Sequence, residues 1–188
     1  TAPRFLGYKL NYFDVNKTGV IDPNKIHNPS QLLLTTNVYG NPSDYKALSQ
    51  IYNDNIIYDN AHCFGVLSPE NIFKQGYAST CSMHATKIFS TGEGGIISFK
   101  SKNSLNIAKK LVNFGISDKE SNLPIGINGK LSELGAAYGL ALYPEIKNML
   151  NKRREIANAY DAGLKDSSVT SLIVDNSEHR SNYAYYSL

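Results

Sequence analysis

The chain has 188 residues, of which 41% are hydrophobic and 19% charged, and its formal net charge is +3. This length accommodates one large domain or a domain with a small appendage, and the composition is ordinary for a soluble globular protein. The weak charge gives no reason to expect nucleic acid or an anionic membrane as a partner. No apolar run approaches the length of a membrane-spanning helix either. The sequence therefore predicts neither nucleic-acid binding nor association with a membrane.

The first half of the chain predicts several strands and one helix. The predicted strands cover Tyr8–Val15, Gln31–Val38, Asn55–Asp59, Tyr77–Met83 and Gly95–Lys100. The run from 31 to 38 is apolar and β-branched without alternation, which is typical of a strand buried in a parallel sheet. Ser43 is expected to cap a helix that continues to about Asn53. Strand, helix and strand at this spacing predict a βαβ unit.

The second half predicts three helices and two further strands. The helices cover 101–114, 132–143 and 144–164, and the strands cover Ser171–Asp175 and Asn182–Leu188. Gly115 is expected to end the first helix, and 116–127 to form an irregular loop. Pro144 separates the second helix from the third, because proline cannot continue the backbone ladder. Gly135 and Gly139 would let the second helix pack closely on a neighbour.

Three polar side chains follow the predicted strands. Asp59 ends one strand, His62 comes three residues later, and Lys87 lies between the strand 77–83 and a glycine-rich turn. In α/β folds, ligands collect at the carboxyl ends of the strands. A carboxylate for the ring nitrogen and an amine for covalent attachment are the groups that pyridoxal 5′-phosphate (PLP) needs. The sequence therefore predicts PLP as the cofactor, and it contains no spacing typical of metal ligands.

Four segments carry a resemblance to a known family. They are Val38–Pro42, Tyr58–His62, Ser82–Gly95 and Gly126–Leu134. In this order they resemble the DegT/DnrJ/EryC1 family of PLP-dependent nucleotide-sugar aminotransferases. Together with Asn113–Ile116, they are most similar to the branch that aminates C4 of nucleotide-linked 4-keto-6-deoxyhexoses.

The resemblance implies an α/β fold of the type I PLP-dependent aminotransferase class. Its mostly parallel central sheet has flanking helices, and a small C-terminal α+β domain follows. Residues 1–143 would belong to the large PLP-binding domain, and residues 144–188 would form a linking helix and the start of the small domain. By comparison with the family, an N-terminal portion that helps hold the cofactor phosphate is expected to be missing, so the chain would be a fragment.

The resemblance also implies roles for the two charged candidates. Lys87 would attach the cofactor covalently and, once released, carry a proton between the substrate carbon and the cofactor. Asp59 would keep the ring nitrogen protonated, so that the ring draws electrons from the adjacent carbon. The simpler interpretations are a solvated lysine before a turn and an aspartate that caps the turn after its strand.

Three further residues gain roles by the same resemblance. His62 would face the cofactor ring, Ser82 would bind its phosphate, and Asn128 would reach the phosphate of the partner subunit's cofactor, which implies a homodimer with shared active sites. The competing interpretations are a satisfied buried histidine, an ordinary polar residue and a loop residue in a left-handed conformation. Ile127 and Lys130 stand where the family often has an aromatic residue and an arginine.

The function implied is amino transfer from an amino acid, with glutamate as the expected donor, to a nucleotide-linked keto-deoxysugar. The expected sugar is dTDP-4-keto-6-deoxyglucose, and the product would serve surface polysaccharide or glycoside biosynthesis. The alternatives are a catalytically incompetent fragment and a non-enzymatic assembly or regulatory protein with the same fold. A dehydratase of this fold would need a residue other than Lys87 at that position.

The two cysteines, Cys63 and Cys81, lie beside the proposed cofactor site in the sequence. A single possible pair is weak support for a disulfide. We expect reduced thiols and a cytoplasmic enzyme.

Overall fold

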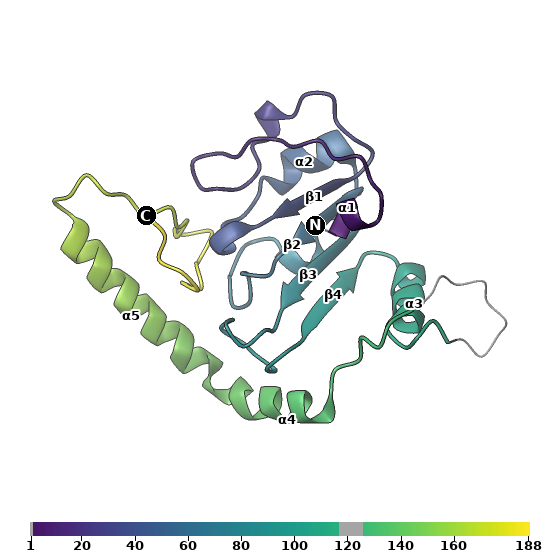
Figure 1. Ribbon diagram of the computed structural model, residues 1–188. Helices are drawn as coiled ribbons and strands as arrows, with labels where there is room; N and C mark the ends of the chain where they lie inside the picture. The colour runs from purple at the N-terminus through teal and green to yellow at the C-terminus, as the bar shows by residue number, and fades with distance from the viewer. Residues whose placement is uncertain (1, 117–125) are drawn as a thin grey trace.

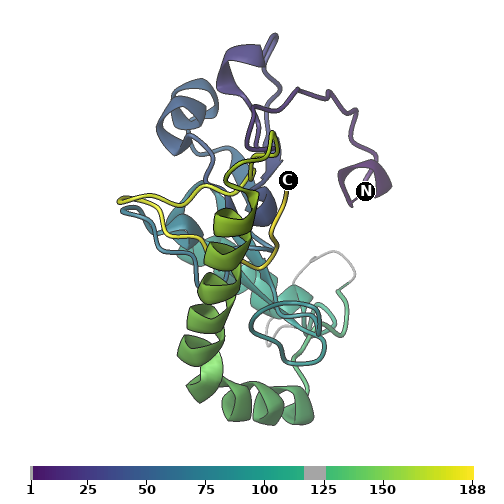
Figure 2. The ribbon, with the colours of Figure 1, turned by 90° about the vertical axis from the view of Figure 1, so that its left-hand side faces the viewer.

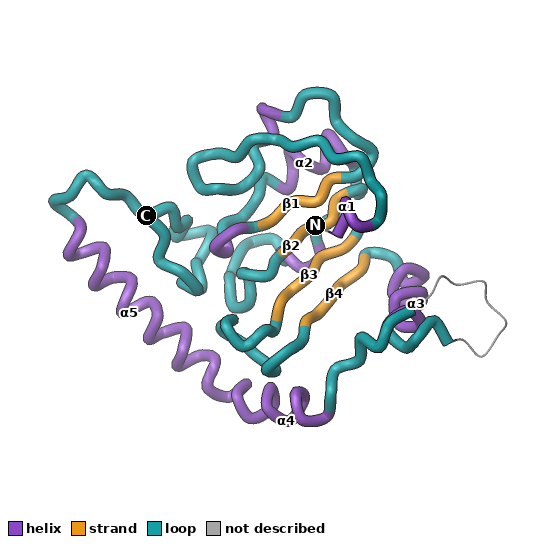
Figure 3. The backbone as a smooth tube through the Cα atoms, in the orientation of Figure 1, coloured by secondary structure: helices purple, strands orange, loops and turns teal. Residues whose placement is uncertain are grey.

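The computed structural model describes residues 2–116 and 126–188 and is built around a four-stranded sheet. The strands are β1 (Leu33–Thr36), β2 (Ile56–Asp59), β3 (Ala78–Ser82) and β4 (Gly95–Phe99), in that spatial order. The first three strands are parallel, and β4 pairs with β3 in the antiparallel direction (Figures 1 and 3). The predicted α/β fold with a mostly parallel sheet is confirmed.

Helix α2 (Tyr45–Tyr52) connects β1 to β2, as the predicted βαβ unit requires. Its N-cap is Asp44, whose carboxylate accepts a hydrogen bond from the Ala47 N–H at 2.9 Å. The prediction that Ser43 caps this helix is therefore wrong by one residue. The Ser43 hydroxyl instead donates to the Asn37 side chain at 2.6 Å, because that asparagine is buried at the end of β1 and needs partners.

The hydrophobic core lies between α2 and one face of the sheet, and Figure 2 shows α2 to one side of the strands. Its buried members include Leu33, Tyr45, Leu48, Tyr52, Ile56, Tyr58 and Ile72. Side chains on the other face stay open, with Leu34 48% and Ile97 50% exposed. Strand β1 was expected to be buried on both faces, but it alternates between buried and exposed residues.

In the part of the chain that the structure describes, three helices follow the sheet. They are α3 (Lys102–Leu111), α4 (Glu133–Leu142) and α5 (Ile146–Leu164). The hydroxyls of Ser101 and Ser132 cap the first two. Pro144 lies in a short 3₁₀ turn that separates α4 from α5 and redirects the chain (Figure 1). Gly139 lets α4 pack against the turn after Lys87, because a Cβ there would come within 2.9 Å of the Thr91 methyl group.

Three predicted strands do not form. Residues 8–15 are irregular apart from one bridge between Val15 and Ile21. The C-terminal segment 171–188, here called the tail, contains neither predicted strand. Some of its backbone N–H groups bond to asparagine side chains instead of to a neighbouring strand; Val174, for example, donates to Asn41 at 2.8 Å. A short helix, α1 (Ala2–Phe5), was not predicted, and most of the predicted loop 116–127 lies outside the described residues.

The described residues include no helix with the combination of length and apolarity that crossing a bilayer would require.

Replacing Gly76 by alanine should destabilise the chain. Gly76 has a φ of +68°, and an added Cβ would overlap the carbonyl oxygen of Ile56 and approach the Tyr58 ring to 3.0 Å. We expect the free energy of unfolding to fall by more than about 2 kcal/mol in urea titrations followed by circular dichroism. Gly7→Ala is the control, because Gly7 has a similar φ of +82° with no atom within 4 Å. Gly7→Ala should lower the free energy of unfolding only by the backbone strain, about 1–2 kcal/mol. An equal decrease in both variants would contradict the packing argument.

Candidate active site

The parallel strands bring four of the five candidate residues to one edge of the sheet. Asp59 and Ser82 are the last residues of β2 and β3, and His62 follows β2. Lys87 lies in the turn between β3 and β4, which starts and ends at this same edge because Ser82 pairs with Gly95. Elements far apart in sequence thus place a carboxylate, a hydroxyl, an imidazole and an amine together.

Asn128 lies elsewhere. It is exposed, and its backbone bridges Asn113 just beyond the C-terminus of α3. Nearby, the Lys130 ammonium donates to the Asn113 side chain at 2.9 Å and sits 4.4 Å from the centre of the Phe114 ring. Within one subunit Asn128 does not join the other four residues, so the role expected for it requires a second copy of the chain.

Asp59 and Lys87 act on the same two neighbouring side chains. Burial lowers the pKa of His62, the Lys87 ammonium lowers it further, and the Asp59 carboxylate raises it. Burial and the Asp59 carboxylate raise the pKa of the Cys81 thiol to about 11, while Lys87 opposes them. Asp59 ends β2, and Lys87 follows β3, the strand that pairs with β2. The amine and the carboxylate therefore lie at the same edge of the sheet.

The two charges converge without forming an ion pair. Asp59 uses one carboxylate oxygen, Oδ1, to accept the Ala61 N–H at 3.0 Å. Within the described ranges, its Oδ2 has no hydrogen-bond partner, and neither does the Lys87 ammonium. Because Asp59 and Lys87 do not pair with each other, the Asp59 Oδ2 atom and the Lys87 amine are both available to bind a ligand. A flat ring with a basic nitrogen on one side and a reactive carbon on the other fits this donor set.

His62 is held by two tyrosines. Its Nδ1 accepts a hydrogen bond from the Tyr39 N–H at 3.1 Å, so the proton of the neutral ring is on Nε2. The ring centre lies 4.8 Å from that of Tyr185 and 6.3 Å from that of Tyr39, which is nearly parallel to it. Tyr39 has a φ of 58°, a strained conformation for a residue that is not glycine. The imidazole is thus fixed in place with one nitrogen left to donate.

The turn that carries Lys87 is braced by its own polar residues. The Ser82 hydroxyl accepts the His84 N–H at 3.3 Å and keeps its own proton for a further acceptor, such as a phosphate oxygen. His84 Nδ1 lies 3.0 Å from the Thr86 hydroxyl, and His84 Nε2 lies 3.5 Å from the Glu93 carboxylate. His84 and Glu93 therefore shape the turn.

Sequence reasoning missed the buried asparagines that join the strand ends. Asn37 donates to the side chains of Asn60 at 2.5 Å and Tyr45 at 3.0 Å. Asn60 donates to the Ser79 hydroxyl at 2.6 Å and to the Ile72 carbonyl at 3.2 Å. The signal available in the sequence was position alone, since each asparagine directly follows a strand. Their network fixes the residues immediately next to Asp59.

The sequence matches the DegT/DnrJ/EryC1/StrS aminotransferase family over residues 3–188. The chain belongs to this family.

Individual proteins are similar to this chain in sequence or in fold. The dTDP-4-amino-4,6-dideoxy-D-glucose transaminase of Shigella dysenteriae is 37% identical over 161 residues, which cover 84% of this chain and 44% of the relative. The crystal structure of DesI with its TDP-sugar product superposes with a TM-score of 0.86 at 24% identity and covers 98% of this chain and 50% of DesI. A Streptococcus pneumoniae protein in its PLP form gives a TM-score of 0.82 at 18% identity, with coverages of 98% and 55%. The chain thus spans about half the length of these relatives, and the structures share its fold.

Stability should fall on the acid side of neutrality. Burial lowers the pKa values of both His62 and His179, whereas in the unfolded chain histidine titrates at about 6.5. The unfolded state then binds more protons than the folded state between the lowered values and about 6.5. The free energy of unfolding should therefore be highest above about pH 6.5 and should decrease as the pH falls through and below this value.

Urea titrations from about pH 7.5 to about pH 5 measure this slope. The double variant His62→Gln, His179→Gln should show a shallower decrease than the unchanged chain. An identical slope would mean that other groups cause the acid sensitivity.

Proposed function

We propose that this family member acts as a PLP-dependent aminotransferase. It takes an amino group from an amino acid, glutamate being the expected donor, and delivers it to a nucleotide-linked keto-deoxysugar. The observation that carries the proposal is that the ends of β2 and β3 bring Asp59 and Lys87 to one edge of the sheet. In the described ranges, neither residue forms an ion pair there. The name of the Shigella dysenteriae relative, dTDP-4-amino-4,6-dideoxy-D-glucose transaminase, supports dTDP-4-keto-6-deoxyglucose as the keto sugar. The product would serve surface polysaccharide or glycoside biosynthesis.

The residues of this chain divide the work. Bound PLP supplies an electron sink next to the reacting carbon. The Asp59 carboxylate would hold a proton on the ring nitrogen through its open oxygen. Lys87 would hold the cofactor covalently and, as a free amine, would carry a proton to or from the substrate carbon. Ser82 would donate a hydrogen bond to the phosphate, and the imidazole of His62, fixed by Tyr39, would donate one from Nε2 to the cofactor.

We also propose that the active protein is a homodimer in which Asn128 completes the partner's phosphate site. Exposed apolar side chains on and before α4 support this, because a patch of this kind needs a cover. They include Leu134 at 85% and Leu140 at 76% exposure, together with Ile127, Leu131 and Tyr138. Asn128 lies beside this patch in the sequence, so a partner seated on α4 would lie next to it.

Two further proposals concern organisation. The short turn at Pro144 supports a boundary between a large PLP-binding domain in residues 1–143 and a linking helix with the start of a small domain in residues 144–188. Both Cys63 and Cys81 are free thiols, which supports a cytoplasmic location, where thiols stay reduced.

Lys87→Ala should abolish covalent cofactor binding. The unchanged chain mixed with PLP should develop a visible absorption band that the variant lacks, and glutamate should bleach the band of the unchanged chain. Lys100→Ala is the matched control, because Lys100 follows β4 at the opposite edge of the sheet and pairs with Asp54 at 2.5 Å.

Asp59→Asn should keep the band but lose amino transfer to keto sugars. Absence of a band in the unchanged chain would overturn the proposal and favour the non-catalytic alternatives.

Leu134→Glu should convert the dimer to a monomer. A carboxylate on the apolar surface of α4 would have to lose its hydration in the interface, at a cost of several kcal/mol. Sedimentation velocity measures the change in mass, and circular dichroism checks that the fold is kept. Leu6→Glu is the control, since Leu6 is 70% exposed on a segment outside this patch. A dimer that survives Leu134→Glu would place the interface elsewhere.

A further inference from the structure

The tail lies between α5 and the loops that follow the strands (Figure 1). We propose that Asn182, in this tail, is a positioning residue that sets the place of the His62 imidazole. The catalytic meaning of this assignment rests on the function proposed above, whereas the positioning itself can be measured without cofactor.

Asn182 uses its whole side chain to hold the loop of His62. It is 2% exposed, and its amide nitrogen donates to the carbonyl oxygens of His62 at 2.7 Å and Phe64 at 2.8 Å. Its own oxygen accepts the Ala184 N–H at 3.0 Å. One of the two carbonyls belongs to His62 itself, and the other is two residues further along. A single amide group therefore fixes the backbone on both sides of the residue between them.

Helix α5 fixes Asn182 from the other side. The Arg154 guanidinium donates to the Ser181 carbonyl at 3.3 Å, and Arg153 donates to the Tyr183 and Ala184 carbonyls at 3.2 and 3.3 Å. These contacts lie on either side of Asn182 in the chain. They connect the helix to the His62 loop through only one intervening residue.

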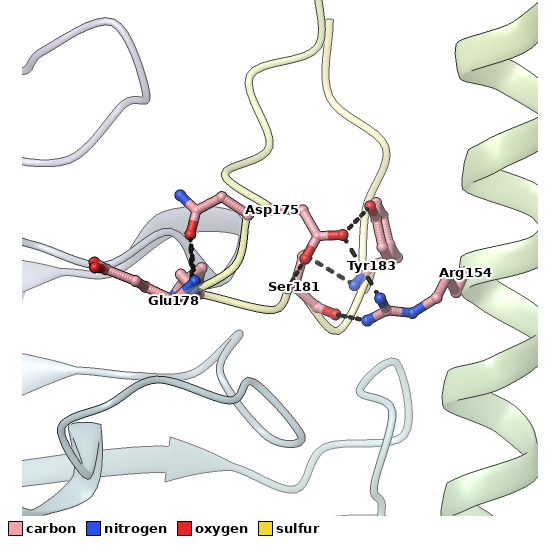
Figure 4. A network of polar contacts seen from close by, with 7 residues as sticks. Arg154, Asp175, Glu178, Ser181 and Tyr183 are labelled. Atoms are coloured by element: carbon pink, nitrogen blue, oxygen red, sulfur yellow. Dashed lines mark hydrogen bonds and ion pairs between the residues drawn. The ribbon is translucent and has the colours of Figure 1, made fainter.

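An acidic residue completes the frame around Asn182. Figure 4 shows the Asp175 carboxylate bound by the Tyr183 hydroxyl at 2.7 Å and the Ser181 N–H at 2.9 Å, with Arg154 at 3.7 Å. Asp175 thus holds Ser181 and Tyr183, the two neighbours of Asn182 in the chain. These bonds make the frame rigid without touching His62.

The imidazole ring of His62 is held by residues other than Asn182, which holds the His62 backbone. Tyr39 supplies the N–H to Nδ1, and the ring of Tyr185, three residues after Asn182, packs against the imidazole. The charged groups that face it are Asp59 from β2 and Lys87 from the turn before β4. Releasing the backbone of His62 would let the ring move away from Tyr39 and toward water.

Other anchors keep the tail docked without Asn182. Asn41 donates to the Leu172 carbonyl at 2.9 Å and accepts the Val174 N–H at 2.8 Å. His179 Nε2 bonds to the Gly40 carbonyl at 3.1 Å. Because none of these hydrogen bonds is made by Asn182 or accepted by residues 62–64, loss of Asn182 should loosen His62 and leave the rest of the tail in place.

The test uses Asn182→Leu, which removes both donors while keeping similar volume and adding no charge. Histidine titrations by NMR on the cofactor-free chain give the midpoints of His62 and His179, assigned with His62→Gln and His179→Gln. In Asn182→Leu the His62 midpoint should move up toward the ordinary value of about 6.5, while that of His179 stays. Asn182→Ala should give the same pattern and guards against a misfit of leucine.

The control is Tyr183→Phe, which removes the bond to Asp175 one residue away from Asn182. It should lower stability and leave the His62 midpoint in place, because Asp175 is not among the groups that act on His62. An unchanged His62 midpoint in both Asn182 variants would overturn the assignment. Joint movement of His62 and His179 would overturn it too, because Asn182 would then be a general anchor of the tail. Since no cofactor is present, this result is independent of the Lys87→Ala experiment, and a missing absorption band would count against the proposed function alone.

Discussion

The hydrogen bond between the Asn37 and Asn60 side chains is the contact on which the candidate site depends most. Each asparagine directly follows a parallel strand, and their backbone N–H groups continue the ladder, from Asn37 to the Asp59 carbonyl at 3.0 Å and from Asn60 to the Thr80 carbonyl at 2.9 Å. A buried amide is stable only when its polar atoms are bonded. The network therefore closes the ends of three strands and holds the Asp59 backbone at the edge where the ligand would bind.

Around this edge the chain keeps two opposite charges apart. An ammonium and a carboxylate so placed would gain from pairing, yet Asp59 instead accepts a backbone N–H from its own loop. The turn that carries Lys87 is braced by Ser82 and His84 and packed under Gly139 of α4. These loop contacts hold Asp59 and Lys87 in place, although the two side chains do not pair with each other. Pre-organised groups need little rearrangement when the cofactor and substrate bind.

The tail also holds the loop of His62 in place, from the C-terminal part of the chain. Asparagine side chains replace the strand pairing that its sequence predicts, and they bond backbone groups of the loops after β1 and β2. Helix α5 and the candidate site are thereby connected through hydrogen bonds to main-chain carbonyls. The chain spans about half the length of the relatives it matches, and within it this connection links α5 to the residues of the candidate site.

The sequence by itself determined the strands of the parallel sheet and the helix that connects the first two, because strand and helix patterns are local signals. It also singled out Asp59, His62 and Lys87 as strand-end candidates, whereas Ser82 came from the family resemblance. It did not reveal that Ser43 and Asn37 form a network, that residues 8–15 and the tail form no strands, or that one face of β1 stays open. Those outcomes depend on which groups meet in space. A backbone N–H takes whichever acceptor the fold brings within reach, and only the tertiary structure decides whether that acceptor is a strand or an asparagine.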